Sequence, residues 1–178
     1  MILKADGIVG NHKGLPLRQR KSIRLKDYDY SQAGLYFMTI CTQNRLHLFG
    51  EIVNDNMVFN DAGNMIEKLW REIPNHFKNT RLHEYIIMPN HIHGIIEISS
   101  TCKTIGNIVG AFKSLTTNEY IKMVKQNILP SFDKRIWQHN YWEHIIRDEH
   151  EHTHIAQYMM DNPQTWAMDQ LNVGGKPL

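Results

Sequence analysis

The sequence has 178 residues, of which 42% are hydrophobic and 21% charged, so it describes one folded domain and excludes a disordered chain. No apolar run approaches the length of about 18 residues that a membrane-spanning helix needs, and the first residues lack a signal-peptide core, so we expect a cytoplasmic protein. Cys41 and Cys102 form no metal or redox motif, which fits a reducing compartment.

The net charge of +2 is uninformative, but its distribution predicts an irregular basic arm over residues 1–34. This segment shows neither strand nor helix periodicity. Residues 13–26 contain six basic residues and no acidic residue: Lys13, Arg18, Arg20, Lys21, Arg24 and Lys26. The run is typical of a solvated arm without a partner, or of an arm that contacts a nucleic-acid backbone. In the second case we expect DNA contacts from Arg18, Arg20, Lys21 and Arg24.

The rest of the chain predicts strands and helices in a regular order. Runs of aromatic and β-branched residues predict strands at 35–42, 82–88, 91–98 and 141–147, and a small hairpin at 51–59. Helical periodicity predicts helices at 61–78 and 105–125, and a last helix from 149 to about 162. Asn60, Thr104 and Asp148 are suited to cap their N-termini. Pro74 should kink the first helix or end it early, and Pro163 should end the last.

Without the small hairpin, this order is β-α-β-β-α-β followed by a helix. It predicts an α+β fold of the ferredoxin-like, split βαβ type, with an antiparallel sheet and a central third strand. The domain should span residues 35–170 and leave a tail at 171–178. Two crossover helices would cover one face of the sheet, and the last helix would cover the other.

The third predicted strand carries two histidines in an otherwise apolar run. Side chains alternate along a strand, so His91 and His93 should share one face, whereas Ile92 and Ile96 should face the core. Two imidazoles on neighbouring positions of one face can share a metal ion. The alternative is a pair of hydrogen-bonded structural histidines.

The last helix carries a second His-x-His motif, His152 and His154. Residues two apart on a helix diverge by roughly 200°, so this pair should not chelate one ion. Residues four apart do share a face, and at that spacing the helix presents His150, His154, Tyr158 and Asn162. The stripe is either the solvated side of the helix or a site that combines a nucleophile, Tyr158, with an oxygen ligand, Asn162.

Aromatic and polar residues alternate near the start of the fourth predicted strand. Trp137, Tyr141 and Trp142 are separated by Gln138, His139 and Asn140. Such a cluster can stack on unpaired bases, and we expect Trp137 to contact DNA. Core packing is the alternative, above all for Trp142, which falls inside the strand.

Three runs, 88–94, 136–147 and 158–163, together resemble the REP-associated tyrosine transposases. These belong to the HUH single-tyrosine insertion-sequence transposases, named for two histidines that flank a hydrophobic residue, here Ile92. Residues 20–31 and 36–43 also look like the usual start of such proteins. The resemblance covers the chain from residue 18 to residue 166.

The resemblance implies a DNA strand-transfer enzyme that acts on single-stranded or hairpin DNA as a monomer or homodimer. His91 and His93 would bind Mg²⁺ or Mn²⁺, with Asn162 as third ligand and His154 in reserve. Tyr158 would attack a DNA phosphate and form a 5′-phosphotyrosine with a free 3′-hydroxyl. For the other six tyrosines we expect packing roles.

Two alternatives remain open from the sequence. One is a relative of the transposases that keeps the fold and binds DNA without cutting it. The other is a zinc hydrolase built on the His-x-His pair, although the sequence offers no HExxH-type ligand set for it.

Overall fold

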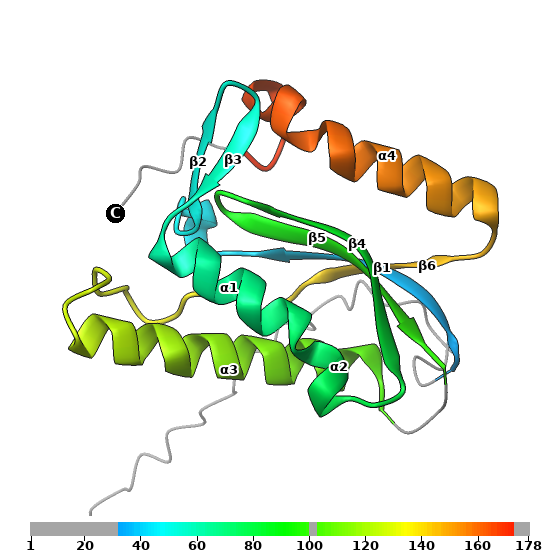
Figure 1. Cartoon of the computed structure of the whole chain (residues 1–178), viewed down its shortest axis with the longest axis horizontal. Helices are drawn as coiled ribbons and strands as arrows, with labels where there is room; N and C mark the ends of the chain where they lie inside the picture. Colours follow the sequence, from blue (N-terminus) through cyan, green and yellow to red (C-terminus); the bar gives the residue numbers. More distant parts are fainter. Residues whose placement is uncertain (1–31, 100–102, 173–178) are drawn as a thin grey trace, which may run out of the picture.

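Four strands form the central sheet of the protein, seen in a computed structural model that describes residues 32–99 and 103–172 (Figure 1). They are β1 (Gly34–Cys41), β4 (Thr80–Met88), β5 (His91–Ile98) and β6 (Trp142–Ile146). Their spatial order is β4-β5-β1-β6, and each neighbouring pair is antiparallel. β2 (Gly50–Val53) and β3 (Asn56–Phe59) form a separate hairpin. The α+β, ferredoxin-like prediction is confirmed, with the histidine-bearing strand in the interior of the sheet.

The helices lie on both faces of this sheet (Figure 1). The elements are α1 (Asp61–Arg71), α2 (Ile73–His76), α3 (Ile105–Lys125) and α4 (Glu149–Thr165), with short 3-10 turns η1 (Gln43–Arg45) and η2 (Trp166–Met168). The three predicted caps are present: the side chains of Asn60, Thr104 and Asp148 each accept a backbone N–H of the first helical turn. Thr104 does so within a reciprocal capping box.

Proline changes two helices in different ways. The helix predicted at 61–78 ends at Arg71, and a separate short helix, α2, begins with Pro74 in its first turn, where a missing N–H costs no hydrogen bond. The predicted end of the last helix near Asn162 is wrong, because α4 continues through Pro163 to Thr165. Pro163 lies in the final turn, so it interrupts the helical hydrogen bonds only where the helix is about to end.

The sheet separates two sets of buried side chains. α1 and α3 cover the larger core, in which Ile92, Ile96 and Ile98 of β5 pack with Trp70. α4 covers the opposite face over a smaller cluster of Phe37, Ile95, Ile146 and Met159. The smaller cluster leaves room on its face for polar residues of β5, and the candidate site lies there.

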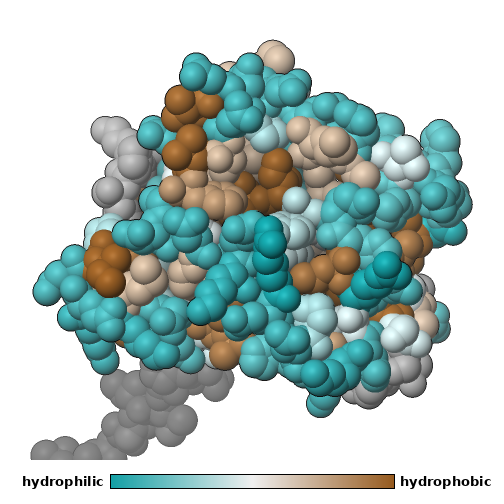
Figure 2. All heavy atoms as spheres, in the orientation of Figure 1, coloured by the Kyte–Doolittle hydropathy of each residue, from teal (hydrophilic) through white to brown (hydrophobic). Residues whose placement is uncertain are grey.

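Figure 2 shows a mostly hydrophilic surface, with hydrophobic side chains gathered in its upper part and in smaller groups elsewhere. On the β2–β3 hairpin, Val53 and Val58 are exposed. Within residues 32–99 and 103–172, no helix is long and apolar enough to cross a membrane. The predicted basic arm, apart from residues 32–34, lies outside the described residues, as does the tail beyond residue 172.

Gly94 provides a test of the close contact between β5 and α1. A Cβ added at Gly94 would overlap the indole ring of Trp70, which is itself fully buried. We expect Gly94→Ala to destabilise the protein by about 1–3 kcal/mol in urea unfolding, the usual cost of overpacking a core. Gly110→Ala is the matched control, because nothing lies near its added Cβ on α3. It should stabilise by about 0.5–1 kcal/mol through helix propensity, and equal effects of the two variants would contradict the packing.

Candidate active site

Two histidines of β5 lie next to each other beneath α4. His91 and His93 are 0% and 3% exposed, and their ring centroids are 4.4 Å apart. Alternation along β5 turns both away from the main core, in which Ile92 packs. The predicted shared face is confirmed, and the two rings are close enough to act on one ligand.

The orientation of His91 is determined by Asn90. The Asn90 amide nitrogen donates to the carbonyl oxygens of Arg45 and Leu171 at 3.2 and 2.9 Å, so its oxygen is the acceptor for His91 Nδ1 at 2.8 Å. His91 Nδ1 therefore carries the proton and Nε2 keeps its lone pair. Within the described part of the chain, His91 Nε2 is buried and has no hydrogen-bond partner.

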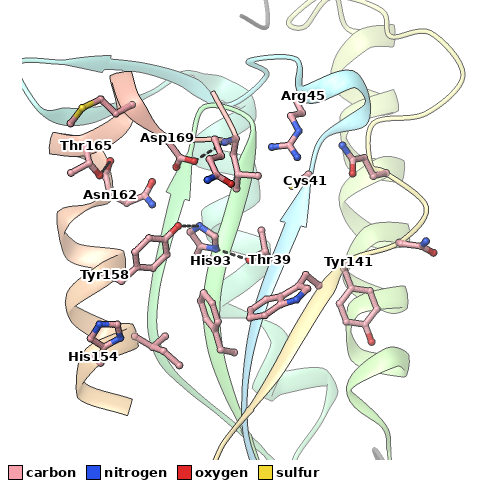
Figure 3. A pocket seen from close by; sticks show the side chains of 18 residues that line it. Thr39, Cys41, Arg45, His93, Tyr141, His154, Tyr158, Asn162, Thr165 and Asp169 are labelled. Carbon is pink, nitrogen blue, oxygen red and sulfur yellow. Dashed lines mark hydrogen bonds between the residues drawn. The ribbon is translucent and has the colours of Figure 1, made fainter. Parts of the chain in front are cut away.

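The second histidine is held in the same manner. His93 Nδ1 lies 2.9 Å from the Thr39 hydroxyl on β1, where the two residues are direct partners in the sheet. Its Nε2 faces α4 and lies 3.4 Å from the Tyr158 hydroxyl (Figure 3). In metal-binding histidines one ring nitrogen is usually anchored in this way, and here the other nitrogen of His93 makes only a long hydrogen bond to Tyr158.

α4 brings part of its polar stripe to the side of His93 (Figure 3). Tyr158 points toward His93, with ring centroids 5.4 Å apart, and remains 45% exposed. Asn162, one turn later, is 1% exposed, and its Oδ1 has no hydrogen-bond partner among the described residues. His154, one turn earlier, lines the same cavity. The structure thus brings together the residues that the sequence placed on this stripe, except His150.

Burial and charge set the protonation of the site. Burial lowers the pKa of His93 to about 4, and that of His91 well below its ordinary value, with a further contribution from the charges of His93 and Arg45. Burial also raises the pKa of Tyr158, as does the Asp169 carboxylate, while a hydrogen bond from Asn162 opposes them. At neutral pH the imidazoles are neutral and the phenol is protonated.

The chemistry of these donors fits a divalent metal ion. His91 Nε2 and Asn162 Oδ1 are buried polar atoms without partners, which is costly unless something binds them. Both histidines are neutral, the form in which imidazole binds a metal. Imidazole nitrogens bind transition-metal ions, whereas an amide oxygen also suits Mn²⁺ and Mg²⁺, so the mixed set fits Mn²⁺ better than Mg²⁺.

Two charged residues that the sequence did not single out also face this cavity of about 800 Å³ (Figure 3). Arg45 follows β1, and its Nη1 is buried without a hydrogen-bond partner within the described residues. Asp169 follows η2, and its Oδ2 is likewise buried without a hydrogen-bond partner within the described residues. The unpaired guanidinium nitrogen of Arg45 can donate a hydrogen bond to a phosphate oxygen. Arg45 ends the short turn η1 and Asp169 lies in the irregular segment after η2, and neither place has a periodicity that indicates the direction of a side chain.

The expectation for Trp137 is corrected by its position in the core. Its ring is 4% exposed and packs against Phe49 and Phe112, and its indole N–H donates to the Thr116 hydroxyl at 2.9 Å. A base has no access to it. Trp142 is the exposed ring instead, at 46%, and it lines the cavity. Because β6 is an edge strand, a residue within it can still be open to solvent.

The remaining candidates lie elsewhere. Tyr36 and Tyr120 are buried in the main core, and the Tyr85 hydroxyl accepts a hydrogen bond from Arg71 away from the site. His152 and His154 diverge as predicted, because His152 lies against β4 while His154 lines the cavity. The four arm residues expected to bind DNA, Arg18, Arg20, Lys21 and Arg24, lie outside the described residues.

Comparisons with known proteins agree with this geometry. Residues 32–162 match the family described as Transposase IS200 like. An uncharacterized protein of Haemophilus influenzae is 42% identical over 178 aligned residues, covering 88% of this chain and 95% of the relative. A second H. influenzae protein, 25% identical over 76% of this chain and 73% of its own length, has the provisional name REP-associated tyrosine transposase.

Among solved structures, a REP-associated tyrosine transposase bound to a REP hairpin superposes with a TM-score of 0.58. It covers 83% of this chain and 77% of its own, at 17% sequence identity. This similarity concerns the fold.

Acid should destabilise the metal-free protein through His93. The pKa of His93 is about 4 in the folded protein and 6.5 in the unfolded chain. Its contribution to the free energy of unfolding is therefore complete above pH 6.5 and is lost as the pH falls toward 4. At about 1.4 kcal/mol per pKa unit, the loss is roughly 3 kcal/mol. The free energy of unfolding, measured in urea with a chelator present, should therefore decline less between pH 7 and pH 4 for His93→Gln than for the wild type. Parallel profiles would contradict a neutral, buried imidazole.

Proposed function

This chain belongs to the IS200-like transposase family, and we propose that it cleaves and rejoins single-stranded or hairpin DNA through a 5′-phosphotyrosine at Tyr158. One observation carries the proposal. The Tyr158 hydroxyl lies 3.4 Å from His93 Nε2 in a cavity that Asn162 also lines, and the His91 ring lies 4.4 Å from the His93 ring beneath that cavity. His91 Nε2 and Asn162 Oδ1 are buried without hydrogen-bond partners among the described residues, so a nucleophile lies near a set of open ligand atoms.

His91, His93 and Asn162 would hold the metal ion, Mg²⁺ or Mn²⁺. His154, the reserve ligand, is not within binding range of both histidines in this arrangement and would have to turn toward them. When bound, the ion would polarise a phosphate oxygen and offset negative charge that develops during attack. Asn90 and Thr39 would keep the two imidazoles in the orientation that leaves Nε2 available. The buried Nη1 of Arg45 would donate a hydrogen bond to a second phosphate oxygen.

Tyr158 would supply the attacking oxygen. The bond from its phenolic oxygen to phosphorus forms while the bond from phosphorus to the 3′ oxygen breaks. The phenol loses its proton and the departing 3′ oxygen gains one, so the step is balanced and needs no cofactor energy. Rejoining is the reverse reaction. The raised pKa of Tyr158 means that a bound cation, rather than the free protein, must favour its deprotonation.

DNA would reach this cavity along the face that Trp142 borders. Its exposed ring can stack on an unpaired base, a role we transfer from Trp137. The basic arm, with Arg18, Arg20, Lys21 and Arg24, would add contacts to phosphates that do not depend on sequence. Tyr158 reaches His93 of its own chain, so a monomer would suffice for the reaction.

The alternatives are less well supported. A zinc hydrolase needs a third strong ligand, yet the described residues offer no His, Cys, Asp or Glu within binding range of both His91 and His93. A relative that binds DNA without cutting would not need a tyrosine directed at the histidine pair. The adduct experiment below separates it from the enzyme.

Replacement of the nucleophile is the direct test. Tyr158→Phe removes only the phenolic oxygen, so we expect unchanged DNA affinity and no covalent adduct after incubation with labelled hairpin DNA and Mn²⁺, as read on a denaturing gel. Tyr141→Phe, at the border of the same cavity, is the control and should keep the adduct. An adduct in Tyr158→Phe, or none in the wild type with several hairpins, would overturn the proposal.

The third ligand is tested separately by calorimetry with Mn²⁺. Asn162→Ala removes the ligand oxygen and should weaken binding by about 10-fold or more, whereas Asn162→Asp keeps an oxygen, adds charge and should restore or tighten it. His154→Ala is the matched comparison on the neighbouring turn. If His154→Ala weakened binding and Asn162→Ala did not, the reserve ligand would be the true one.

A further inference from the structure

The edge strand β4 contains a bulge that faces α4. Leu82 pairs with Ile96 and Tyr85 with Gly94, so β4 advances three residues while β5 advances two. A bulge redirects side chains relative to regular alternation. Here two consecutive residues, His83 and Glu84, both contact residues on the α4 side of the sheet.

A third donor comes from α4 itself, which lies along β4 in Figure 1. His152 Nε2 lies 3.2 Å from Glu84 Oε2, and the His152 ring is 5.6 Å from the His83 ring. One ligand atom from each of these three residues lies within 4.8 Å of the others. Within residues 32–99 and 103–172, no other group of three His, Cys, Asp or Glu side chains comes as close.

The donors of this cluster are only partly satisfied. His152 Nε2 is shielded from solvent, and its approach to Glu84 does not have the geometry of a hydrogen bond. His83 Nε2 lies 2.9 Å from Glu97 Oε2 on β5, which adds a second carboxylate beside the group. The four side chains are between 20% and 47% exposed, so an ion from solution can reach them.

The cluster is separate from the candidate active site. None of its residues lines the cavity of Tyr158 and His93. Instead, His83 and Glu84 border a different hollow between β4 and α4, of about 320 Å³.

We propose that His83, Glu84 and His152 form a second metal site, selective for Zn²⁺ or a similar transition-metal ion, that links α4 to β4. Two imidazoles and one carboxylate are a donor set that zinc prefers and Mg²⁺ does not. Ligands around tetrahedral zinc lie about 3.3 Å apart, so the side chains must close by up to about 1.5 Å, which rotamer changes at this open site allow. Glu97 or water would complete the coordination.

Such an ion would restrain the helix that carries the proposed nucleophile. His152 and Tyr158 are on the same helix, which contacts the sheet through the small apolar cluster around Ile95 and Met159 and through the pair of Glu151 with His144 of β6. A metal link near its N-terminal half would hold α4 on its own sheet. This consequence for strand transfer rests on the proposed function, whereas the metal site does not.

Zinc uptake by the full chain tests the site. The double variant His91→Ala/His93→Ala removes binding at the first site, so calorimetry with Zn²⁺ alone should then report one equivalent. Co²⁺ in its place should give the absorption of a tetrahedral ion. Adding His152→Gln or Glu84→Gln should abolish this uptake, and adding His150→Gln, an exposed histidine on the same helix, should leave it unchanged.

Thermal unfolding gives a second readout. Zn²⁺ at about 100 times its Kd should raise the midpoint of the double variant by roughly 5–10 °C, and the shift should vanish with His152→Gln or Glu84→Gln. No uptake by the double variant, or equal uptake after His152→Gln and His150→Gln, would overturn the second site. The adduct experiment with Tyr158 is independent of this outcome, so failure of one proposal does not imply failure of the other.

Discussion

The buried side-chain amide of Asn90 joins three segments that are distant in the sequence, and the geometry of the site depends on it. Its nitrogen binds the carbonyl oxygens of Arg45, after β1, and Leu171, after α4, while its oxygen holds His91. The main-chain carbonyl oxygen of Asn90 also accepts a hydrogen bond from the backbone N–H of Thr42. Because the side-chain amide is buried and its nitrogen and oxygen are both hydrogen-bonded, it specifies the tautomer of His91 and the path of the segment that closes the cavity.

The same region holds polar atoms that folding leaves unsatisfied. They are His91 Nε2, Asn162 Oδ1, Arg45 Nη1 and Asp169 Oδ2. Each such atom costs about 1–3 kcal/mol, which is large compared with the 5–15 kcal/mol that typically stabilises a domain. Their concentration beneath one end of α4 is therefore difficult to explain by stability, and it is what a site for a cation and a phosphate requires.

Periodicity in the sequence predicted the elements and the faces of β5 and α4 because each depends on local geometry. Two-residue alternation separated His91 and His93 from Ile92, and the four-residue spacing of a helix joined Tyr158 to Asn162. The errors have local causes too. Trp137 lies in an irregular segment before β6, where alternation does not apply, and Trp142 is exposed because β6 is an edge strand. The bulge at His83 and Glu84 interrupts the alternation that a regular strand would show.

The sequence by itself therefore determined the order of strands and helices, the α+β fold and the residues that share a face with the two histidines. The tertiary structure alone decided that Arg45 and Asp169 line the cavity and that Asn90 orients His91. It also decided that His152, and not His154, is the histidine of α4 that contacts β4. The physical reason is the same in each case. A period along the chain reports the direction of a side chain within one element, whereas a contact between elements depends on bulges, loops and packing that no local pattern encodes.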